Sequence, residues 1–135
     1  LEEHGLPEAI GQLGRKLTAG NGIAFHLEVE GEPRALPPEV ENNLLRISQE
    51  ALTNAVRHAA AGQIQVRLRF KPATVRLEVS DDGHGFVPAV ETAPGENGRF
   101  GLSGMRERAD AMHARLDIQS DGESGTRIEF EVSTE

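Results

Sequence analysis

The sequence contains no cysteine, which excludes both a disulfide framework and a thiolate metal site. It also lacks an apolar stretch near the length of about 18 residues that a membrane-spanning helix needs, and its first residues lack the basic and apolar regions of a signal peptide. Basic residues are few, because 14 Lys and Arg stand against 22 Asp and Glu for a formal net charge of −8. They are scattered along the chain, so neither nucleic acid nor an anionic membrane is expected as a partner.

The chain does carry the pattern of one domain of 135 residues with a core of ordinary size. Changes in apolar periodicity predict the order helix, strand, helix, two strands, long loop, helix, two strands. The expected ranges are 7–19, 23–29, 39–60, 64–70, 75–79, 87–100, 102–113, 114–120 and 127–132. Hairpin-linked strands and amphipathic helices indicate an α+β fold, in which a mixed, mostly antiparallel sheet of about five strands carries three helices on one face.

The segment QEALTNAVRHA at 49–59 places Glu50, Asn54, Arg57 and His58 at spacings of three and four residues. On a helix this spacing aligns a carboxylate, an amide and a cation along one face, because residues three and four apart are neighbours. Such a face can hold both magnesium and phosphate. The asparagine is otherwise poorly placed in mid-helix, since its amide competes for backbone hydrogen bonds.

Two further segments are rich in glycine. DDGHGF at 81–86 follows the alternating run 75–79, so its acidic pair lies where a strand ends and the backbone turns sharply. GRFGLSGMRERA at 98–109 runs from glycines into a predicted helix, which offers backbone N–H groups and the positive end of a helix dipole to an anion. Together the three segments indicate a nucleotide pocket.

These segments, with DGESGTRIEFEV at 121–132, resemble the N, G1, G2 and terminal Gly-Thr boxes of the ATP-binding domain of sensor histidine kinases. The sequences of these motifs are most similar to those of the nitrate-sensor and desaturase-sensor branch, which signals to response regulators with helix-turn-helix output domains. The resemblance covers roughly residues 36–132 and rests on four boxes in the correct order, each at a predicted element boundary. It implies the Bergerat fold, a two-layer α/β sandwich, with residues 1–135 as one catalytic domain and residues 87–100 as its ATP lid.

The resemblance implies roles for the polar residues of the first segment. The side-chain oxygen of Asn54 ligates Mg²⁺, a hard ion that prefers oxygen ligands, and Glu50 binds the metal through water or orients the reacting groups. Arg57 and His58 contact the phosphates or the ribose. An ordinary structural role stays open for each residue, because helix surfaces commonly carry solvated polar side chains.

In the glycine-rich segments, the resemblance assigns the carboxylate of Asp81 to the exocyclic amine of adenine, which an acceptor-only group recognises while it disfavours guanine. The other residues placed around the nucleotide are Gly83, Gly85, Gly101, Leu102, Gly104 and Thr126. The glycines let the backbone approach the phosphates. Thr126 is expected to reach adenine through water or to be a strand threonine without a ligand, and Asp82 is expected to be a turn residue.

None of the five histidines lies on a long amphipathic helix with an acidic residue just after it, the setting of a phosphoacceptor. We therefore expect the catalytic domain of a protein histidine kinase alone, which uses Mg²⁺ and ATP to phosphorylate a dimerisation and phosphotransfer domain of the same kinase and, indirectly, a helix-turn-helix response regulator. Its expected location is the cytoplasm, without membrane contact by the domain, and with a parent protein that is either membrane-anchored or soluble. Two alternatives stay open: an anti-sigma-type serine kinase of the same fold, and an ATP-sensing module that transfers no phosphate.

Overall fold

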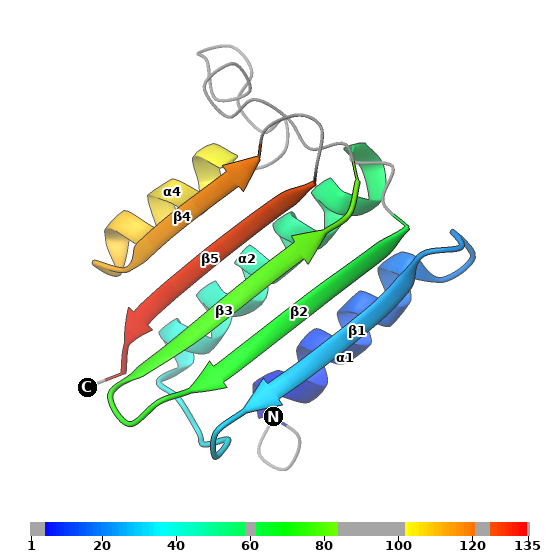
Figure 1. The fold of residues 1–135 in the computed structure, drawn as a ribbon. Helices are drawn as coiled ribbons and strands as arrows, with labels where there is room; N and C mark the ends of the chain where they lie inside the picture. The colour runs from blue at the N-terminus through cyan, green and yellow to red at the C-terminus, as the bar shows by residue number, and fades with distance from the viewer. Residues whose placement is uncertain (1–4, 59–61, 84–101, 121–124, 135) are drawn as a thin grey trace.

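The computed structural model describes residues 5–58, 62–83, 102–120 and 125–134, and Figure 1 shows their arrangement. Within these residues the helices are α1 (Gly5–Thr18), α2 (Pro38–His58) and α4 (Leu102–Ala111). The strands are β1 (Ala24–Glu30), β2 (Gln63–Phe70), β3 (Thr74–Asp81), β4 (Arg115–Ser120) and β5 (Thr126–Ser133). This order agrees with the one predicted from apolar periodicity. The loop and lid expected at 87–100 lie outside the described residues.

The strands form one mixed sheet in the order β1-β2-β3-β5-β4. β1 and β2 are parallel, because α2 carries the chain back along the sheet between them. The other neighbours are antiparallel, and the β2–β3 hairpin closes where the N–H of Lys71 donates to the carbonyl of Thr74 at 2.9 Å. The described helices cover one face of the sheet (Figure 1). The predicted α+β fold, a mostly antiparallel five-stranded sheet with its helices on one face, is confirmed.

The core lies between the sheet and the helices and follows the alternation of strand residues. In β2, Ile64, Val66 and Leu68 are fully buried, while the residues between them face away from the helices. α2 contributes Leu44 and Ile47 to the same cluster, so its apolar stripe fixes which of its residues remain for the candidate site. No helix in the described part of the chain is long and apolar enough to cross a membrane.

Two glycines inside α1 let this helix lie close to β1. A Cβ atom at Gly14 would overlap the ring of Phe25, and one at Gly11 would lie 3.4 Å from Cδ2 of Leu27. From the sequence alone both glycines weaken the predicted helix, because glycine has low helix propensity. The helix nevertheless runs from Gly5 to Thr18, which indicates that its packing outweighs the lost propensity.

The last helix ends earlier than predicted. The pattern predicts a helix over 102–113, whereas α4 ends at Ala111. His113 has a positive φ of 56°, and the N–H of Ala114 donates back to the carbonyl of Ala109 at 2.8 Å. A left-handed residue followed by such a hydrogen bond terminates a helix, so a short turn leads from α4 into β4.

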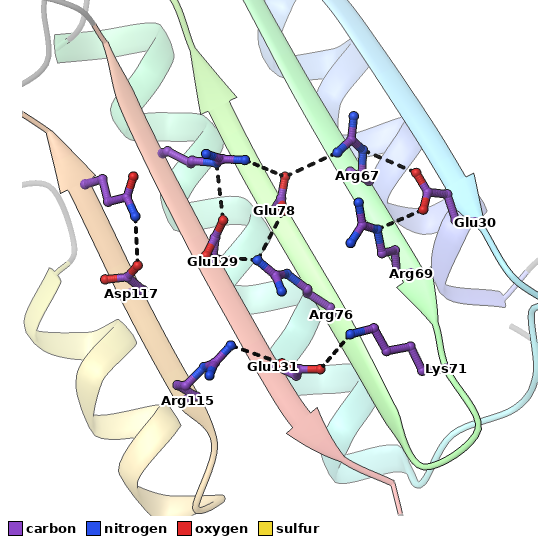
Figure 2. Close-up of polar contacts among 12 residues, drawn as sticks. Glu30, Arg67, Arg69, Lys71, Arg76, Glu78, Arg115, Asp117, Glu129 and Glu131 are labelled. Atoms are coloured by element: carbon purple, nitrogen blue, oxygen red, sulfur yellow. Dashed lines mark hydrogen bonds and ion pairs between the residues drawn. The ribbon is translucent and has the colours of Figure 1, made fainter.

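The face of the sheet away from the helices carries paired charges (Figure 2). Glu78 on β3 lies 3.4 Å from Arg76, 3.8 Å from Arg67 and 3.7 Å from Arg127. Arg76 and Arg127 also pair with Glu129, at 3.0 and 3.2 Å. Arg67 also pairs with Glu30, at 3.4 Å, so within the described residues each basic group of this network lies beside an acidic partner.

Candidate functional site

The predicted site residues that the structure describes gather toward one end of the fold. At this end α2 and β3 finish, and α4 and β5 begin (Figure 1). α2 packs against β3, β5 and α4. The candidate nucleotide site is therefore assembled from elements that are far apart in the sequence.

Asp81 is the last residue of β3, and backbone donors fix its side chain. The N–H of Gly83 donates to Oδ1 of Asp81 at 2.8 Å, and the backbone of Thr126 donates to the same carboxyl group. Asp81 and Thr126 are direct partners in the β3–β5 ladder. Gly125 has a φ of 99°, and a Cβ atom there would collide with the carbonyl oxygen of Asp81. The structure thus brings together the predicted residues Asp81, Gly83 and Thr126, and the glycine at 125 makes room for them.

The two neighbouring aspartates at this strand end have pKa values shifted in opposite directions. Burial raises the pKa of Asp81 above its ordinary value, although two backbone hydrogen bonds oppose the shift. Backbone N–H groups of Gln63 and Gly62 donate to Oδ1 of Asp82, at 2.9 and 2.8 Å, and lower the pKa of Asp82. Asp82 therefore joins the start of β2 to the end of β3, as a structural residue of this turn.

Replacing each of these aspartates by asparagine is expected to change stability in opposite directions. The folded state raises the pKa of Asp81, so the free energy of unfolding of the wild type falls as the pH rises through this pKa and the carboxyl group ionises. Asparagine does not ionise, so Asp81→Asn does not show this fall in stability. The folded state lowers the pKa of Asp82, so its ionised carboxylate adds to the free energy of unfolding, and this contribution is lost as the pH falls through the pKa. Asp82→Asn lacks the charge and therefore lacks this contribution. Near neutral pH we expect Asp81→Asn to be at least as stable as wild type and Asp82→Asn to be less stable. Urea unfolding from acidic to neutral pH measures both, and the opposite ranking of the two variants would contradict the assignment.

Glu50 and Asn54 lie one turn apart on α2, and both are largely removed from solvent. Asn54 is 8% exposed, and the side chain of Glu50 is 25% exposed. Burial raises the pKa of Glu50, while Arg108 and Arg46 lower it. Oε2 of Glu50 is buried and has no hydrogen-bond partner among the described residues, although buried polar atoms are nearly always bonded. This helix face thus presents a buried amide and a carboxylate oxygen with unused acceptor capacity.

These two side chains fit a magnesium ion that is held jointly with a nucleotide. In the described ranges, no group of three or more His, Asp or Glu residues could hold a metal ion by itself. Mg²⁺ usually binds one or two protein groups and completes its shell with water and substrate phosphates. The side-chain oxygen of Asn54 and Oε2 of Glu50 are oxygen atoms of the type that Mg²⁺ prefers.

Gly104 lies on α4, beside Glu50 of α2. A Cβ atom at this position would lie 3.3 Å from Oε1 of Glu50 and 3.0 Å from Nη1 of Arg108. The absence of a side chain at Gly104 therefore gives the two charged groups their place between the helices.

The remaining predicted residues are described in part or not at all. Arg57 is exposed in the last turn of α2. His58 ends α2 and Leu102 begins α4, but the side chains of both lie outside the described residues. Gly85 and Gly101 lie wholly outside them. Their roles stay predictions.

Arg108 contacts the predicted site residue Glu50, and the sequence pattern does not reveal this contact. Its Nη1 lies 3.3 Å from Oε1 of Glu50 and donates to the carbonyl of Gly104 at 3.1 Å. The four-residue spacing of Gly104 and Arg108 places both on one helix face. Only the packing of α4 against α2, however, shows which arginine of this helix meets Glu50.

Comparison with protein families shows one match over most of the chain. Residues 39–135 match the family described as histidine kinase-, DNA gyrase B-, and HSP90-like ATPase. The matched range begins at the start of α2 and includes all of the predicted site residues.

Comparison with individual proteins gives relatives in the same class. DegS of Bacillus subtilis, a signal transduction histidine-protein kinase/phosphatase, is 36% identical over 110 residues, which are 82% of this chain and 28% of that protein. The sensor histidine kinase LiaS of Bacillus subtilis is 33% identical over 132 residues, 98% of this chain and 35% of that protein. The chain thus spans about a third of these relatives. Full-length ShkA, solved in complex with AMPPNP, shares the fold with a TM-score of 0.77 at 20% identity, over 96% of this chain and 30% of that chain.

Proposed function

The chain belongs to the family of histidine kinase-, DNA gyrase B- and HSP90-like ATPases, as the ATP-binding catalytic domain of a sensor histidine kinase. We propose that it binds Mg²⁺-ATP and presents the γ-phosphate to a histidine on a separate dimerisation domain. The observation that carries the proposal is the arrangement on α2. Asn54 is buried and Glu50 is partly buried on one helix face, and Oε2 of Glu50 lacks a hydrogen-bond partner among the described residues.

The adenine end of the proposed site is the end of β3. Asp81 accepts from the exocyclic amine of adenine, while backbone donors from Gly83 and Thr126 hold the carboxylate in place. Since an ionised carboxylate only accepts hydrogen bonds, it favours adenine over guanine, which presents a carbonyl at the equivalent position. Thr126 is buried beside this carboxylate, at 7% exposure, and its proposed contact with adenine is through water.

The phosphate end of the proposed site lies between α2 and α4. A chain with a net charge of −8 attracts a triphosphate only where local donors and cations offset that charge. Arg57 is exposed for such a contact, and the glycine-rich stretch before α4 is proposed to supply backbone N–H groups. Asn54 and Glu50 would hold Mg²⁺, which neutralises phosphate charge when it is bound. The work of the domain is then positioning and electrostatic stabilisation.

The partners of the proposed reaction lie in the parent protein and beyond it. LiaS is a sensor histidine kinase and DegS a kinase/phosphatase, and by analogy we propose that the parent contains a dimerisation and histidine phosphotransfer domain. The phosphoryl group would pass from there to a helix-turn-helix response regulator. The requirement for ATP supports a cytoplasmic location for the domain.

Transfer to a dimerisation domain supplied in trans tests the proposed function. The chain incubated alone with γ-labelled ATP is expected to acquire no phosphohistidine. It is expected to label the dimerisation domain of its parent protein when the two are mixed, because the acceptor histidine lies there. The label should be stable in alkali and labile in acid, as expected of a phosphoramidate. Autoradiography after acid and alkali treatment provides the measurement.

The other outcomes identify the alternatives. Self-labelling on any of the five histidines would contradict an external acceptor. An acid-stable label on a partner protein would indicate a serine kinase. Tight ATP binding without any transfer would indicate a sensing module.

A further inference from the structure

An ion pair joins α4 to the helix that carries the proposed metal site. Nη1 of Arg108 lies 3.3 Å from Oε1 of Glu50, and the two side chains are 23% and 25% exposed. The same nitrogen donates to the carbonyl of Gly104 at 3.1 Å. Arg108 is therefore anchored to its own helix while it holds a carboxylate on another.

The pair lies directly against Gly104 of α4. A Cβ atom at position 104 would lie 3.0 Å from Nη1 of Arg108 and 3.3 Å from Oε1 of Glu50. At these distances a side chain at position 104 would require the guanidinium and the carboxylate to shift by a few tenths of an ångström. The lack of a side chain at Gly104 therefore accommodates the contact between Arg108 and Glu50.

The two carboxylate oxygens of Glu50 have different surroundings. Oε1 is paired with Arg108, whereas Oε2 is buried and has no hydrogen-bond partner in the described part of the chain. A carboxylate held at one oxygen loses rotational freedom, so the position of its second oxygen is fixed as well. Oε2 is the oxygen left for a metal-bound water or for the reacting groups.

We propose that Arg108 is the positioning residue for Glu50, and that it orients the free oxygen of this carboxylate for phosphoryl transfer. The inference rests on the proposed kinase function. Arg108 acts through Glu50, and the contact spans 58 residues of sequence. Arg46 lies one turn before Glu50 on α2 but is exposed. Among the described residues, Arg108 is the cation within ion-pairing distance of this carboxylate.

Phosphoryl transfer by Arg108 variants tests this role. Arg108→Met removes the charge but keeps much of the aliphatic packing, and Arg108→Lys restores a charge without the planar fork of arginine. Arg106→Met is the matched control, because Arg106 is an exposed arginine on the same helix. Transfer to the parent dimerisation domain in trans gives the rate at saturating Mg²⁺-ATP and the KM for ATP.

We expect Arg108→Met to lower the saturating rate on the order of tenfold, since a small misplacement of a reacting group has large kinetic effects, while the KM for ATP changes little. Arg108→Lys should recover part of the rate, and Arg106→Met should match wild type. In a Glu50→Gln background, Arg108→Met should cause almost no additional loss, because the arginine acts through the carboxylate. Urea unfolding of each variant separates these effects from stability.

Other results would contradict either the positioning role of Arg108 or the proposed kinase function. A normal rate in Arg108→Met, even with lower stability, would show that the pair only packs the helices and would overturn the inference. So would an undiminished effect of Arg108→Met in the Glu50→Gln background, or a raised KM at an unchanged rate. Absence of transfer by the wild-type chain would instead overturn the proposed function, and the positioning role with it.

Discussion

Replacement of Asp81 by asparagine is expected to weaken ATP binding by about 1.5–3 kcal/mol, the range for a hydrogen bond to a charged group. This range corresponds to a loss of affinity of roughly 10- to 150-fold. The substitution removes the charge that accepts from the adenine amine in the proposed site. The asparagine oxygen can still accept from the N–H of Gly83, which donates to Oδ1 of Asp81 at 2.8 Å. Since burial raises the pKa of Asp81, loss of its charge is not expected to unfold the domain.

The same substitution is expected to narrow the preference for ATP over GTP. An asparagine amide offers both a donor and an acceptor, and its donor suits the carbonyl of guanine. Calorimetry with both nucleotides on wild type, Asp81→Asn and the control Asp82→Asn makes the measurement. Asp82 is the control because its carboxylate is committed to the backbone of Gly62 and Gln63. Unchanged ATP affinity in Asp81→Asn would remove Asp81 from the site, and an equal loss in both variants would implicate the strand end as a whole.

The parts of the fold that follow local periodicity are predictable from the sequence. Alternation in β2 and β5 identifies Ile64, Val66, Ile128 and Phe130 as buried residues, because side chains in a strand point to opposite faces in turn. The close approach of α1 to β1 is not predictable in this way. Gly14 is only a poor helix residue until the fold brings the ring of Phe25 against it.

The candidate site, too, is only partly predictable from the sequence. Its residue types on α2 are visible in the sequence, because helical spacing aligns Glu50 and Asn54. The contact of Glu50 with Arg108 joins residues 58 positions apart, and no local pattern encodes it. The adjacent carboxyl groups of Asp81 and Asp82 are alike in sequence, yet burial and backbone donors shift their pKa values in opposite directions. Tertiary environment, which a single sequence does not display, therefore decides how the predicted residues can act.

Replacement of Asn54 by alanine is expected to abolish most of the magnesium-dependent part of ATP affinity, a loss of at least about tenfold, while adenosine binding stays nearly intact. Asn54 is 8% exposed on the face of α2 that also carries Glu50, and its proposed role is to ligate Mg²⁺ beside the phosphates. Alanine has the higher helix propensity, so α2 itself should persist. ATP titrations with magnesium and with a chelator, together with adenosine titrations, provide the measurement. Asn42→Ala is the matched control, because Asn42 is exposed on the same helix. Equal losses for ATP and adenosine would instead indicate a packing defect at this buried position.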